Sequence, residues 1–533
     1  MKSELTQKWA LPPGGLRFFI ILLLVLGVFF RFVHLDRKVY WGDEAYTSLR
    51  IAGYKWTDLA PVLDGREIGI EDLQKYQRTN SERGLIDTID SLAVEDPHHP
   101  PLYYVIGRFW MQWFGNSVAV IRSSSALISL LVFPCTYWLC LELFDSSLTG
   151  WVAIALLAVS PFHLLYAQEA REYSLWTVTI LLSSAALLRA MRVKTKLSWG
   201  IYSVALALSL YTFLFSALVA IGHGIYVLAI ESFRLSKRVT AYVLASIAGI
   251  ILFAPWLFIV ITNVSRIQAT NTDKIGRVSL FYLFDMWASN LSRVFFDVPL
   301  GNEKLLLFLI PLTLILVGYS IYFLCSHTPK PVWLFILTLI GTTSLALILP
   351  DLVLGGSRSI GARYLIPSYL GIQLAVAYLL STQMVFFPVK IVPQKLWPLV
   401  MIALVSGGVL SCAMISQADT WWNKYGDSYN PAIARIVNQS TQPLLIADSQ
   451  YRVLSLSYLL DNKVRLKVGL NNKNTPLIPD GFSDIFVFNT FSNRSRGFQE
   501  LIEKEQKGKL ELVYKKDMSF KNREISLWKL IKL

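Results

Sequence analysis

Charged residues are scarce in this sequence of 533 residues. Asp, Glu, Lys and Arg together make up 16% of it, whereas a soluble globular protein usually carries about 25%. Apolar residues are correspondingly abundant, at 54%, and the mean hydropathy is +0.47. The scarcity of charge argues against an ordinary soluble protein and indicates a polytopic membrane protein.

Cysteine is also rare, and several familiar sequence patterns are missing. The four cysteines lie in or at the ends of apolar runs, without the spacing of a metal site or a disulfide framework, so we expect buried thiols. No Walker loop or dinucleotide-binding fingerprint indicates a soluble nucleotide. The first apolar run, residues 16–33, lacks a small-residue cleavage site and is interpreted as a retained membrane span.

The net charge of +14 comes from cations in several short loops. A nucleic-acid-binding protein usually gathers its cations in one patch, so this dispersion predicts no nucleic-acid partner. Basic residues occupy 189–196 and 234–238, and single lysines, Lys330, Lys390 and Lys395, lie in alternate short loops. By the positive-inside rule this side, together with the N-terminus, is cytoplasmic.

Apolar runs of about 20 residues, the length that spans a bilayer, predict about eleven helices in the plasma (inner) membrane. The fifth and sixth are separated only by a break expected at "YTFLFS". An odd number of spans places the C-terminus on the extracytoplasmic side. The expected spans lie near residues 16–34, 119–142, 150–167, 172–190, 198–212, 214–231, 240–261, 305–324, 332–350, 365–383 and 397–416.

The long segments outside the spans are all predicted to be extracytoplasmic. The first loop, residues 35–118, contains an apolar stretch at 101–114 that is too short to span and is interpreted as an interfacial helix. The tail shows strand patterns in "PLLIADSQ", "DIFVFN", "GKLELVYKK" and "EISLWKLI". We therefore predict an all-α polytopic membrane bundle over 1–417 and a small α/β domain over 418–533.

The segment "YWGDEAYT" places two adjacent carboxylates, Asp43 and Glu44, just after the first span. A partly desolvated carboxylate at the mouth of a membrane cavity can act as a general base. Adjacent acids point in different directions on most backbones, so only one is expected to face a site. The structural alternative is the acidic first turn of a helix, which the helix dipole favours.

The segment "EDPHHPPLYY" carries two histidines before two prolines, and the prolines stiffen the entry to the expected interfacial helix. At membrane level His98 and His99 can meet a bound headgroup or a metal ion, since His, Asp and Glu are suitable ligands. A structural role at the interface is the alternative. Tyr103 of the same segment is a further candidate for substrate contact.

The segment "YAQEAREYSL" lies between the third and fourth spans. Its charges, Glu169, Arg171 and Glu172, are at membrane level, where an unpaired charge is costly. They can pair with one another, or Arg171 can bind an anionic group and orient one of the acids. Tyr173 is a further candidate for substrate contact.

The segment "GGSRSIGARYLIPSY" precedes the tenth span. Its glycines allow a close backbone approach, and Arg358 and Arg363 supply cations. A guanidinium group matches phosphate because its planar fork pairs with two oxygens. Tyr364 is a neighbouring candidate, and anchoring to lipid headgroups is the alternative role for the arginines.

All four segments are predicted on the same side of the membrane, although they are far apart in the sequence. Acids and arginines at one membrane rim predict an anionic lipid substrate and a proton-abstracting step. A transporter or flippase for a lipid-linked substrate is the rival hypothesis, since it also carries charges around a cavity. Transporters tend to have inverted repeats and broken helices at the midplane, and the sequence shows neither pattern.

In this order, "GDEAYT", "HPPLYY", "QEAREYSL" and "ARYLIPSY" resemble the motifs of lipid-linked-sugar glycosyltransferases of the C superfamily. The similar branch comprises protein O-mannosyltransferases, lipid A aminoarabinose transferases and bacterial relatives (glycosyltransferase family 39 and the RgtA/B/C/D-like group). The resemblance covers roughly residues 10–420. It implies a bundle of transmembrane and interfacial helices around a cavity open to the outside.

The resemblance also implies a reaction. A sugar on a polyprenyl phosphate is transferred, with inversion, to a hydroxyl of an acceptor protein, lipid or glycan. Asp43 matches the catalytic base and Glu44 the supporting acid, while His99, Arg171 and Arg363 match positions near the donor phosphate. A phosphate leaving group needs no protonating acid, so one base and several cations suffice, unlike the two carboxylates of a glycoside hydrolase. A divalent metal stays open as a cofactor.

Overall fold

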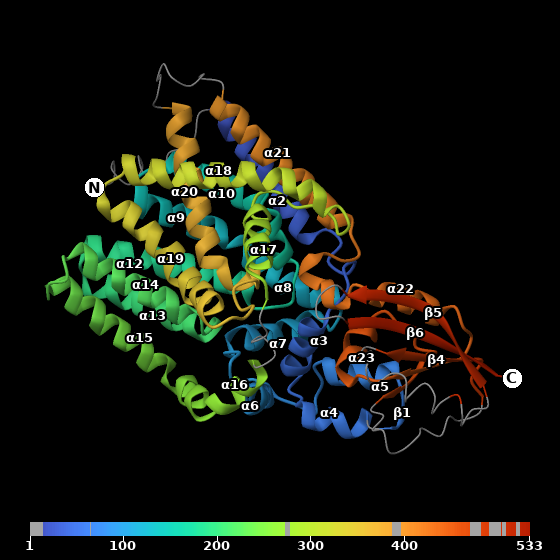
Figure 1. The fold of residues 1–533 in the computed structure, drawn as a ribbon. Coiled ribbons are helices and arrows are strands. Elements are labelled where there is room, and N and C mark those ends of the chain that lie inside the picture. The colour runs from blue at the N-terminus through green and yellow to red at the C-terminus, as the bar shows by residue number, and fades with distance from the viewer. Residues whose placement is uncertain are drawn as a thin grey trace. The chain divides into compact units, whose positions relative to one another are not determined.

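The computed structural model describes residues 14–63, 65–271, 278–385, 396–468, 481–489, 503, 508–518 and 523–532. The chain forms two compact units (Figure 1). The helical unit comprises the residues through Leu35, Asp96–Tyr103 and Arg122–Gln417, and the sheet unit comprises Asp36–Glu95, Tyr104–Ile121 and Ala418–Leu533. The tail thus shares a unit with most of the first loop, a grouping that differs from a single boundary at residue 417. That boundary stays a prediction.

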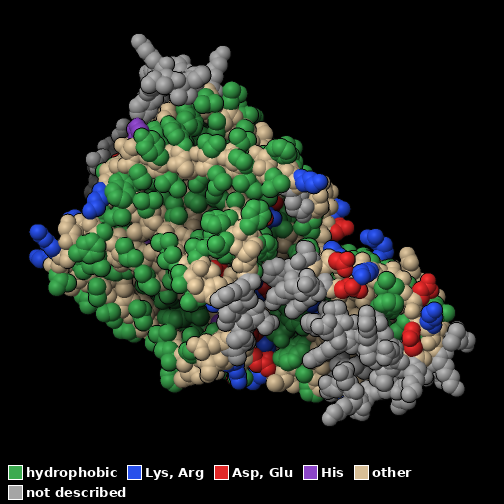
Figure 2. Space-filling view, viewed as in Figure 1, with side chains coloured by type: hydrophobic (Ala, Val, Ile, Leu, Met, Phe, Trp, Pro, Cys, Tyr) green, Lys and Arg blue, Asp and Glu red, His purple; other side chains and the backbone are tan. Residues whose placement is uncertain are grey.

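The helical unit is built from long apolar helices joined by short connections. Figure 2 shows hydrophobic side chains over most of its visible face. The helices are α2 (Gly14–Phe32), α8 (Val118–Leu130, begun in the sheet unit), α9 (Val132–Phe144), α10 (Ser147–Ala158), α11 (Pro161–Ala167), α12 (Tyr173–Val193), α13 (Lys196–Thr212), α14 (Ser216–Ile230), α15 (Lys237–Thr262), α16 (Val264–Asn271), α17 (Leu280–Ser292), α18 (Glu303–His327), α19 (Lys330–Val353), η3 (Ala362–Leu365), α20 (Ile366–Val385) and α21 (Leu396–Gln417).

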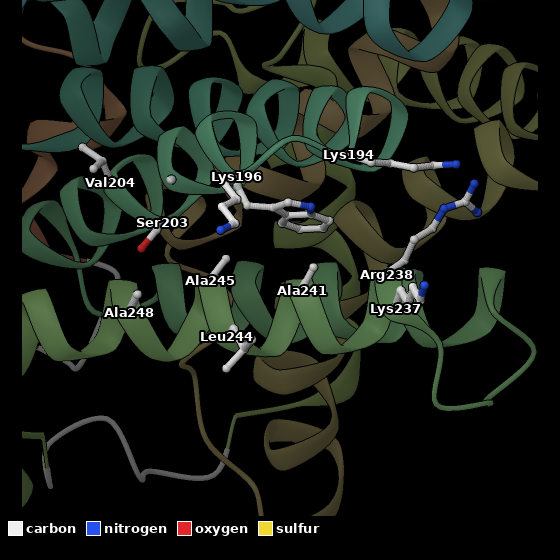
Figure 3. A pocket seen from close by; sticks show the side chains of 12 residues that line it. Lys194, Lys196, Ser203, Val204, Lys237, Arg238, Ala241, Leu244, Ala245 and Ala248 are labelled. Atoms are coloured by element: carbon white, nitrogen blue, oxygen red, sulfur yellow. The ribbon is translucent and has the colours of Figure 1, made fainter.

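Among the described residues, eight helices are long and apolar enough to cross a membrane, or nine if the bent pair α10 and α11 counts as one span. The chain is therefore a multi-pass membrane protein, as predicted. The difference from the expected eleven spans arises at α13 and α14, which have 17 and 15 residues and fall short of the usual spanning length. The expected break at "YTFLFS" is found between them. A groove lies between α13 and α15 (Figure 3).

Close packing of α2 against α10 depends on a small residue and on a buried cation. A Cβ atom added to Gly27 would lie 2.6 Å from the carbonyl oxygen of Ala158, so glycine allows the two helices to approach. One turn later, Arg31 is 1% exposed. It donates hydrogen bonds to the carbonyls of Gly27 and Ala158 and to the hydroxyl of Ser129. These acceptors satisfy a charge that would be costly inside an apolar bundle.

The four cysteines are free thiols. Cys140 and Cys412 are buried and Cys135 is half-buried, whereas Cys325 is exposed on α18. The prediction of buried thiols is therefore wrong for Cys325. The reason is that α18 exposes a broad apolar surface, including Phe308 and Ile315, so a position in an apolar run does not ensure burial within the protein.

The sheet unit contains a six-stranded mixed sheet with the strand order β1-β3-β2-β4-β6-β5. Strands β3, β2 and β4 are parallel, while β1, β6 and β5 are antiparallel to their neighbours. The elements are α3 (Gly42–Ala52), α4 (Trp56–Leu63), β1 (Glu67–Gly69), α5 (Ile70–Gln74), η1 (Lys75–Gln77), α6 (Leu85–Glu95), α7 (Leu102–Phe114, begun in the helical unit), η4 (Trp422–Asp427), α22 (Asn430–Asn438), β2 (Pro443–Ala447), α23 (Gln450–Leu456), β3 (Arg465–Val468), β4 (Asp484–Asn489), β5 (Gly508–Met518) and β6 (Arg523–Lys532).

The strands predicted in the tail are confirmed. The central strand β2 is buried at every position, which matches the continuous apolar runs of central parallel strands. Its side chains Leu444 and Ile446 pack with Ile485 and Val487 of β4. The edge strand β1 was not predicted, because its three residues come from the first loop and pair with β3 about 400 residues later.

Helix α7 occupies the stretch predicted as an interfacial helix. Trp113 and Phe114 near its end are 72% and 58% exposed. Arg108 of the same helix is buried instead, and it donates hydrogen bonds to the carbonyl of Ile51 and the hydroxyl of Thr88. Arg108 thus joins α7 to α3 and α6.

Candidate active site

The acidic pair of "GDEAYT" forms the first turn of α3, as its structural alternative predicted. The helix begins at Gly42, where a Cβ atom would lie only 2.5 Å from the hydroxyl oxygen of Tyr451. A larger residue at this position would have to displace the side chain of Tyr451 on α23. The Gly42 N–H donates to the carboxylate of Asp427 at 2.7 Å, which satisfies one of the unpaired donors at a helix N-terminus.

Asp43 and Glu44 are neighbours in the sequence but have opposite environments. Glu44 is fully buried, and its carboxylate lies 2.5 Å from the Nζ atom of Lys424, which is 1% exposed. Asp43 is only partly buried, and it accepts a hydrogen bond from the Tyr451 hydroxyl at 3.3 Å. Burial raises the pKa of Tyr451 well above its usual value, and Asp43 adds to the effect. Tyr451 therefore acts as a neutral donor beside this carboxylate.

Sequence reasoning missed the partners of the acidic pair, because it assigned no chemistry to the tail. Lys424 and Asp427 lie on η4, and Arg452 forms an ion pair with Asp427 at 2.9 Å. Arg452 also lies over the ring of Tyr451, at 5.8 Å from its centroid. These four residues follow α3 by about 380 to 410 positions, and no local pattern marks them.

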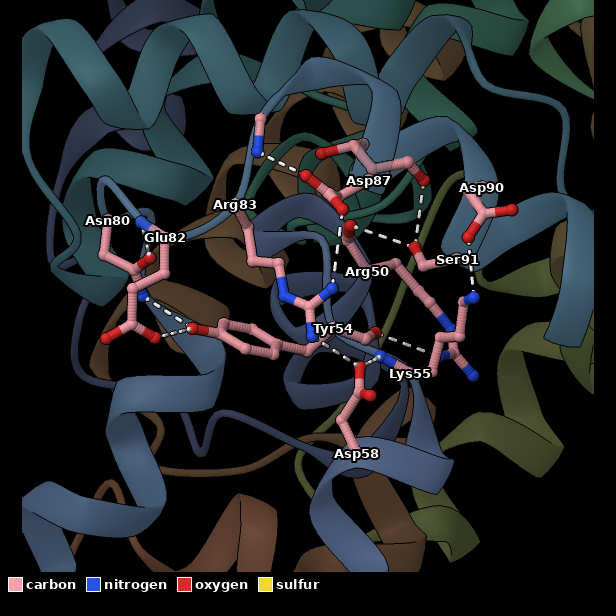
Figure 4. Close-up of polar contacts among 12 residues, drawn as sticks. Arg50, Tyr54, Lys55, Asp58, Asn80, Glu82, Arg83, Asp87, Asp90 and Ser91 are labelled. Atoms are coloured by element: carbon pink, nitrogen blue, oxygen red, sulfur yellow. Dashed lines mark hydrogen bonds and ion pairs between the residues drawn. The ribbon is translucent and has the colours of Figure 1, made fainter.

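The rest of α3 is fixed by a polar network in the first loop (Figure 4). Arg50 in the last turn forms an ion pair with Glu95 at 2.7 Å. Burial opposes the charged form of Glu95, but the Trp56 N–H and Arg50 outweigh it, so the pKa of this carboxyl is lowered. Lys55 pairs with Asp90 at 2.6 Å. The network orients α3 and with it the two acids of its first turn.

In the helical unit, the turn before α12 gathers residues from two of the predicted segments. Glu172 is 1% exposed, and its Oε1 atom lies 3.1 Å from Nδ1 of His99 and 3.2 Å from Nη2 of Arg171. Burial opposes the charge on Glu172, but Arg171 and His99 outweigh it and lower the pKa of the carboxyl to about 2. The rings of His98 and His99 lie 4.3 Å apart. Burial, helped by His99, lowers the pKa of His98 to about 3.

Tyr173 joins the fourth segment to this turn. The guanidinium carbons of Arg171 and Arg363 both lie 5.6 Å from the centroid of its ring. Arg363 also lies over the ring of Tyr364, at 5.2 Å. Cations over aromatic faces are attracted by the ring quadrupole, so the tyrosines hold two arginines at one place. We call Glu172, Arg171, Tyr173 and Arg363 the arginine cluster.

The remaining predicted residues have different positions. Tyr103 is fully buried and exchanges a 2.8 Å hydrogen bond with Ser125, whose hydroxyl contacts the carbonyl of Arg171 at 3.3 Å, so Tyr103 supports the turn. Glu169 is fully buried within it. Arg358 instead forms an ion pair with the buried carboxylate of Asp351 at 3.0 Å.

Metal binding has no dedicated cluster in the part of the chain that the structure describes. Within it, no group of three or more His, Cys, Asp or Glu side chains is placed to hold a metal ion. The arginine cluster offers different chemistry. Guanidinium groups form strong charge-assisted hydrogen bonds with phosphate oxygens, so this cluster can bind an anion. The partly exposed carboxylate of Asp43 can instead accept a proton.

Comparison with known proteins gives a family for part of the chain. Residues 98–259 match the profile of a family described as dolichyl-phosphate-mannose-protein mannosyltransferase. This stretch contains the histidine segment and the turn before α12. The resemblance drawn from the sequence motifs is therefore confirmed. No curated protein matches the sequence significantly.

Solved structures extend the likeness over nearly the whole chain. ArnT from Cupriavidus metallidurans in the apo state matches with a TM-score of 0.56 and 12% identity, covering 97% of this chain and 98% of that chain. The same protein bound to undecaprenyl phosphate matches with a TM-score of 0.52 and 12% identity, covering 96% and 98%. The chain therefore has an ArnT-like fold, which confirms the predicted fold class.

Proposed function

We propose that this protein is an inverting glycosyltransferase that uses a polyprenyl-phosphate-linked sugar and acts on the extracytoplasmic side of the membrane. Asp43 removes the proton from the acceptor hydroxyl, and the oxygen attacks the anomeric carbon. The bond to the lipid phosphate breaks as the new glycosidic bond forms. Undecaprenyl phosphate is bound by the structurally similar ArnT, which supports a donor of this class.

The contrast between Asp43 and Glu44 carries the proposal. A general base must come within hydrogen-bond reach of the proton that it removes, and Asp43 keeps partial exposure on a helix that is fixed at both ends. Glu44 is fully buried against Lys424. We therefore assign the base to Asp43 and a supporting role to Glu44.

The arginine cluster supplies the second part of the proposed reaction. The departing lipid phosphate gains negative charge, and fixed cations stabilise such a transition state. Arg171 and Arg363 are held by Tyr173, so we assign the donor phosphate to them. His99 lies beside the same turn through its contact with Glu172, which supports a position near the donor.

Strand pairing supports placing the first loop and the tail on one side of the membrane. Glu67–Gly69 pairs with Arg465–Lys467, and a bilayer cannot pass between hydrogen-bonded strands. The number of crossings between the two segments must therefore be even. Among the described residues, nine spans are counted if the bent pair α10 and α11 crosses the membrane, and eight of them follow α2. With the positive-inside rule, the shared side is the extracytoplasmic one.

The replacement Asp43→Asn tests the proposal. Because general-base catalysis typically contributes 10²–10⁴-fold, we expect a loss of sugar transfer of about that size with an unchanged unfolding profile. Asp419→Asn is the control, since Asp419 is a 57% exposed carboxylate of the same unit that pairs with Arg37. Near-normal turnover of Asp43→Asn, measured by mass spectrometry of the product, would contradict the mechanism.

The donor is identified by mass spectrometry of polyprenyl-phosphate sugars that copurify with the protein. Transfer of the sugar to an acceptor hydroxyl is the expected result. Movement of an intact donor between leaflets, without cleavage, would favour the flippase hypothesis instead. The same assay with a strong chelator tests metal dependence, because full activity would remove a metal from the reaction.

A further inference from the structure

A groove of about 700 Å³ lies between the N-terminal halves of α13 and α15 in the helical unit (Figure 3). It forms because both helices present small residues there. On α13, a Cβ atom added to Gly200 would meet nothing within 4 Å. On α15, the groove is lined by Ala241, Ala245 and Ala248. Farther along, the helices close, since a Cβ atom on Gly249 would lie 2.9 Å from the carbonyl oxygen of Ser203.

Four cations line the same groove: Lys194, Lys196, Lys237 and Arg238. Arg238 is partly neutralised by Glu231, at 2.8 Å. Among the described residues, the three lysines form no ion pair. The groove therefore combines an apolar lining with a net positive charge.

The position of these cations within their helices is unusual. Lys196 is the first residue of α13, and Lys237 and Arg238 open α15. A helix N-terminus carries partial positive charge and favours acids, yet neither first turn contains one. The N-caps use the neutral hydroxyls of Thr195 and Ser236. Positive-inside topology requires cations in a loop, but it does not require them at two helix N-termini beside an apolar groove.

We propose that this groove binds an anionic glycerophospholipid. The lipid phosphate contacts the lysines and the two helix N-termini, and one acyl chain lies along the small residues and Val204. Basic pockets between transmembrane helices on the cytoplasmic side are suited to anionic headgroups, and the loops that carry these cations are predicted to be cytoplasmic. Trp199 lines the groove near the headgroup, a level at which tryptophan is enriched.

The test is native mass spectrometry of the full chain in detergent, titrated with phosphatidylglycerol or phosphatidylcholine. We expect preferential binding of phosphatidylglycerol by the wild type. One cation near a membrane surface contributes about 1 kcal/mol, or a factor of about five. The double variant Lys196→Gln/Lys237→Gln should therefore bind phosphatidylglycerol about 10- to 30-fold more weakly. The charge-matched control is Arg234→Gln/Lys330→Gln, whose exposed cations do not line the groove.

A second variant tests the apolar part of the groove separately. Val204 is 51% exposed and lines the groove, so Val204→Trp should fill it and reduce binding of the lipid while all cations remain. A photoreactive acyl chain on phosphatidylglycerol should crosslink to residues 199–204 and 241–248. Equal binding of the two lipids by the wild type, equal losses in the charge-matched control, or crosslinks confined to other helices would overturn the proposal.

Discussion

The start of α3 in the sheet unit and the turn before α12 in the helical unit are both built around a buried carboxylate, but they use it differently. Glu44 pairs with Lys424 at 2.5 Å. Glu172 is shared between His99 and Arg171. At α3 the buried acid pairs with a lysine, and a second acid, Asp43, lies directly before Glu44 in the same turn. At α12 the buried acid contacts two basic side chains, and Arg363 lies over the ring of the adjacent Tyr173.

In both regions a buried carboxylate orients its neighbours. At α3 the neighbour is another carboxylate, whereas at α12 the neighbours are arginines. At α3 the buried pair fixes the first turn, and the adjacent carboxylate of Asp43 stays partly exposed. The buried acid at α12 orients Arg171, and Arg363 is held beside it by the rings of Tyr173 and Tyr364. We infer that the first region is organised to accept a proton and the second to bind an anion.

The largest effect on this comparison is expected from Lys424→Met. It leaves Glu44 buried without its cation, and removing one partner of a buried pair typically costs about 3–5 kcal/mol. The free energy of unfolding, measured by denaturant titration in detergent, should fall by that amount. The double variant Glu44→Gln/Lys424→Met should recover most of it, because both charges of the pair are then removed. A loss below about 1 kcal/mol for the single variant would show that this pair does not organise α3.

The next effect is expected from Arg363→Ala. Fixed donors at a developing charge are typically worth about 10²–10³-fold in rate, so we expect a loss of this size that is larger for the donor than for the acceptor. Arg358→Ala is the matched control, because Arg358 pairs with Asp351 and should affect stability without selecting the donor. Equal losses for donor and acceptor in Arg363→Ala, from steady-state kinetics, would argue against a phosphate contact.

Much of the fold could be predicted from the sequence, because most membrane spans and the strands β2, β4, β5 and β6 have local patterns, although the internal strand β3 was missed. The break between α13 and α14 was placed correctly from a short run of aromatic and polar residues. The edge strand β1 could not be predicted, since three residues carry no periodicity and their partner β3 is far away in the chain. Pairing between distant segments also explains why the predicted tail domain differs from the observed sheet unit, which includes most of the first loop.

The candidate site also contains some residues that the sequence marks and others that it does not. The turn before α12 was predictable because a charge at membrane level is costly, which marks Arg171, Glu172 and Arg363 in an apolar context. Lys424 and Tyr451 lie in the polar tail, where charges and tyrosines are ordinary, so nothing set them apart. Arg358 and Arg363 looked equivalent in the sequence. In the structure Arg358 pairs with Asp351, whereas Arg363 lies over the rings of Tyr173 and Tyr364.

The smallest expected effect concerns the pH dependence of stability at Glu172. Its pKa is about 2 in the folded protein, below its ordinary value of 4.5. The stabilisation is therefore fully present above about pH 4.5 and is lost as the pH falls towards about 2, with a size of about 3 kcal/mol. Glu172→Gln lacks this term, so the wild type should lose more unfolding free energy than the variant between about pH 6 and about pH 3. Parallel curves would show that Arg171 and His99 do not stabilise the charged carboxylate, and the contrast with Glu44 would then rest on geometry alone.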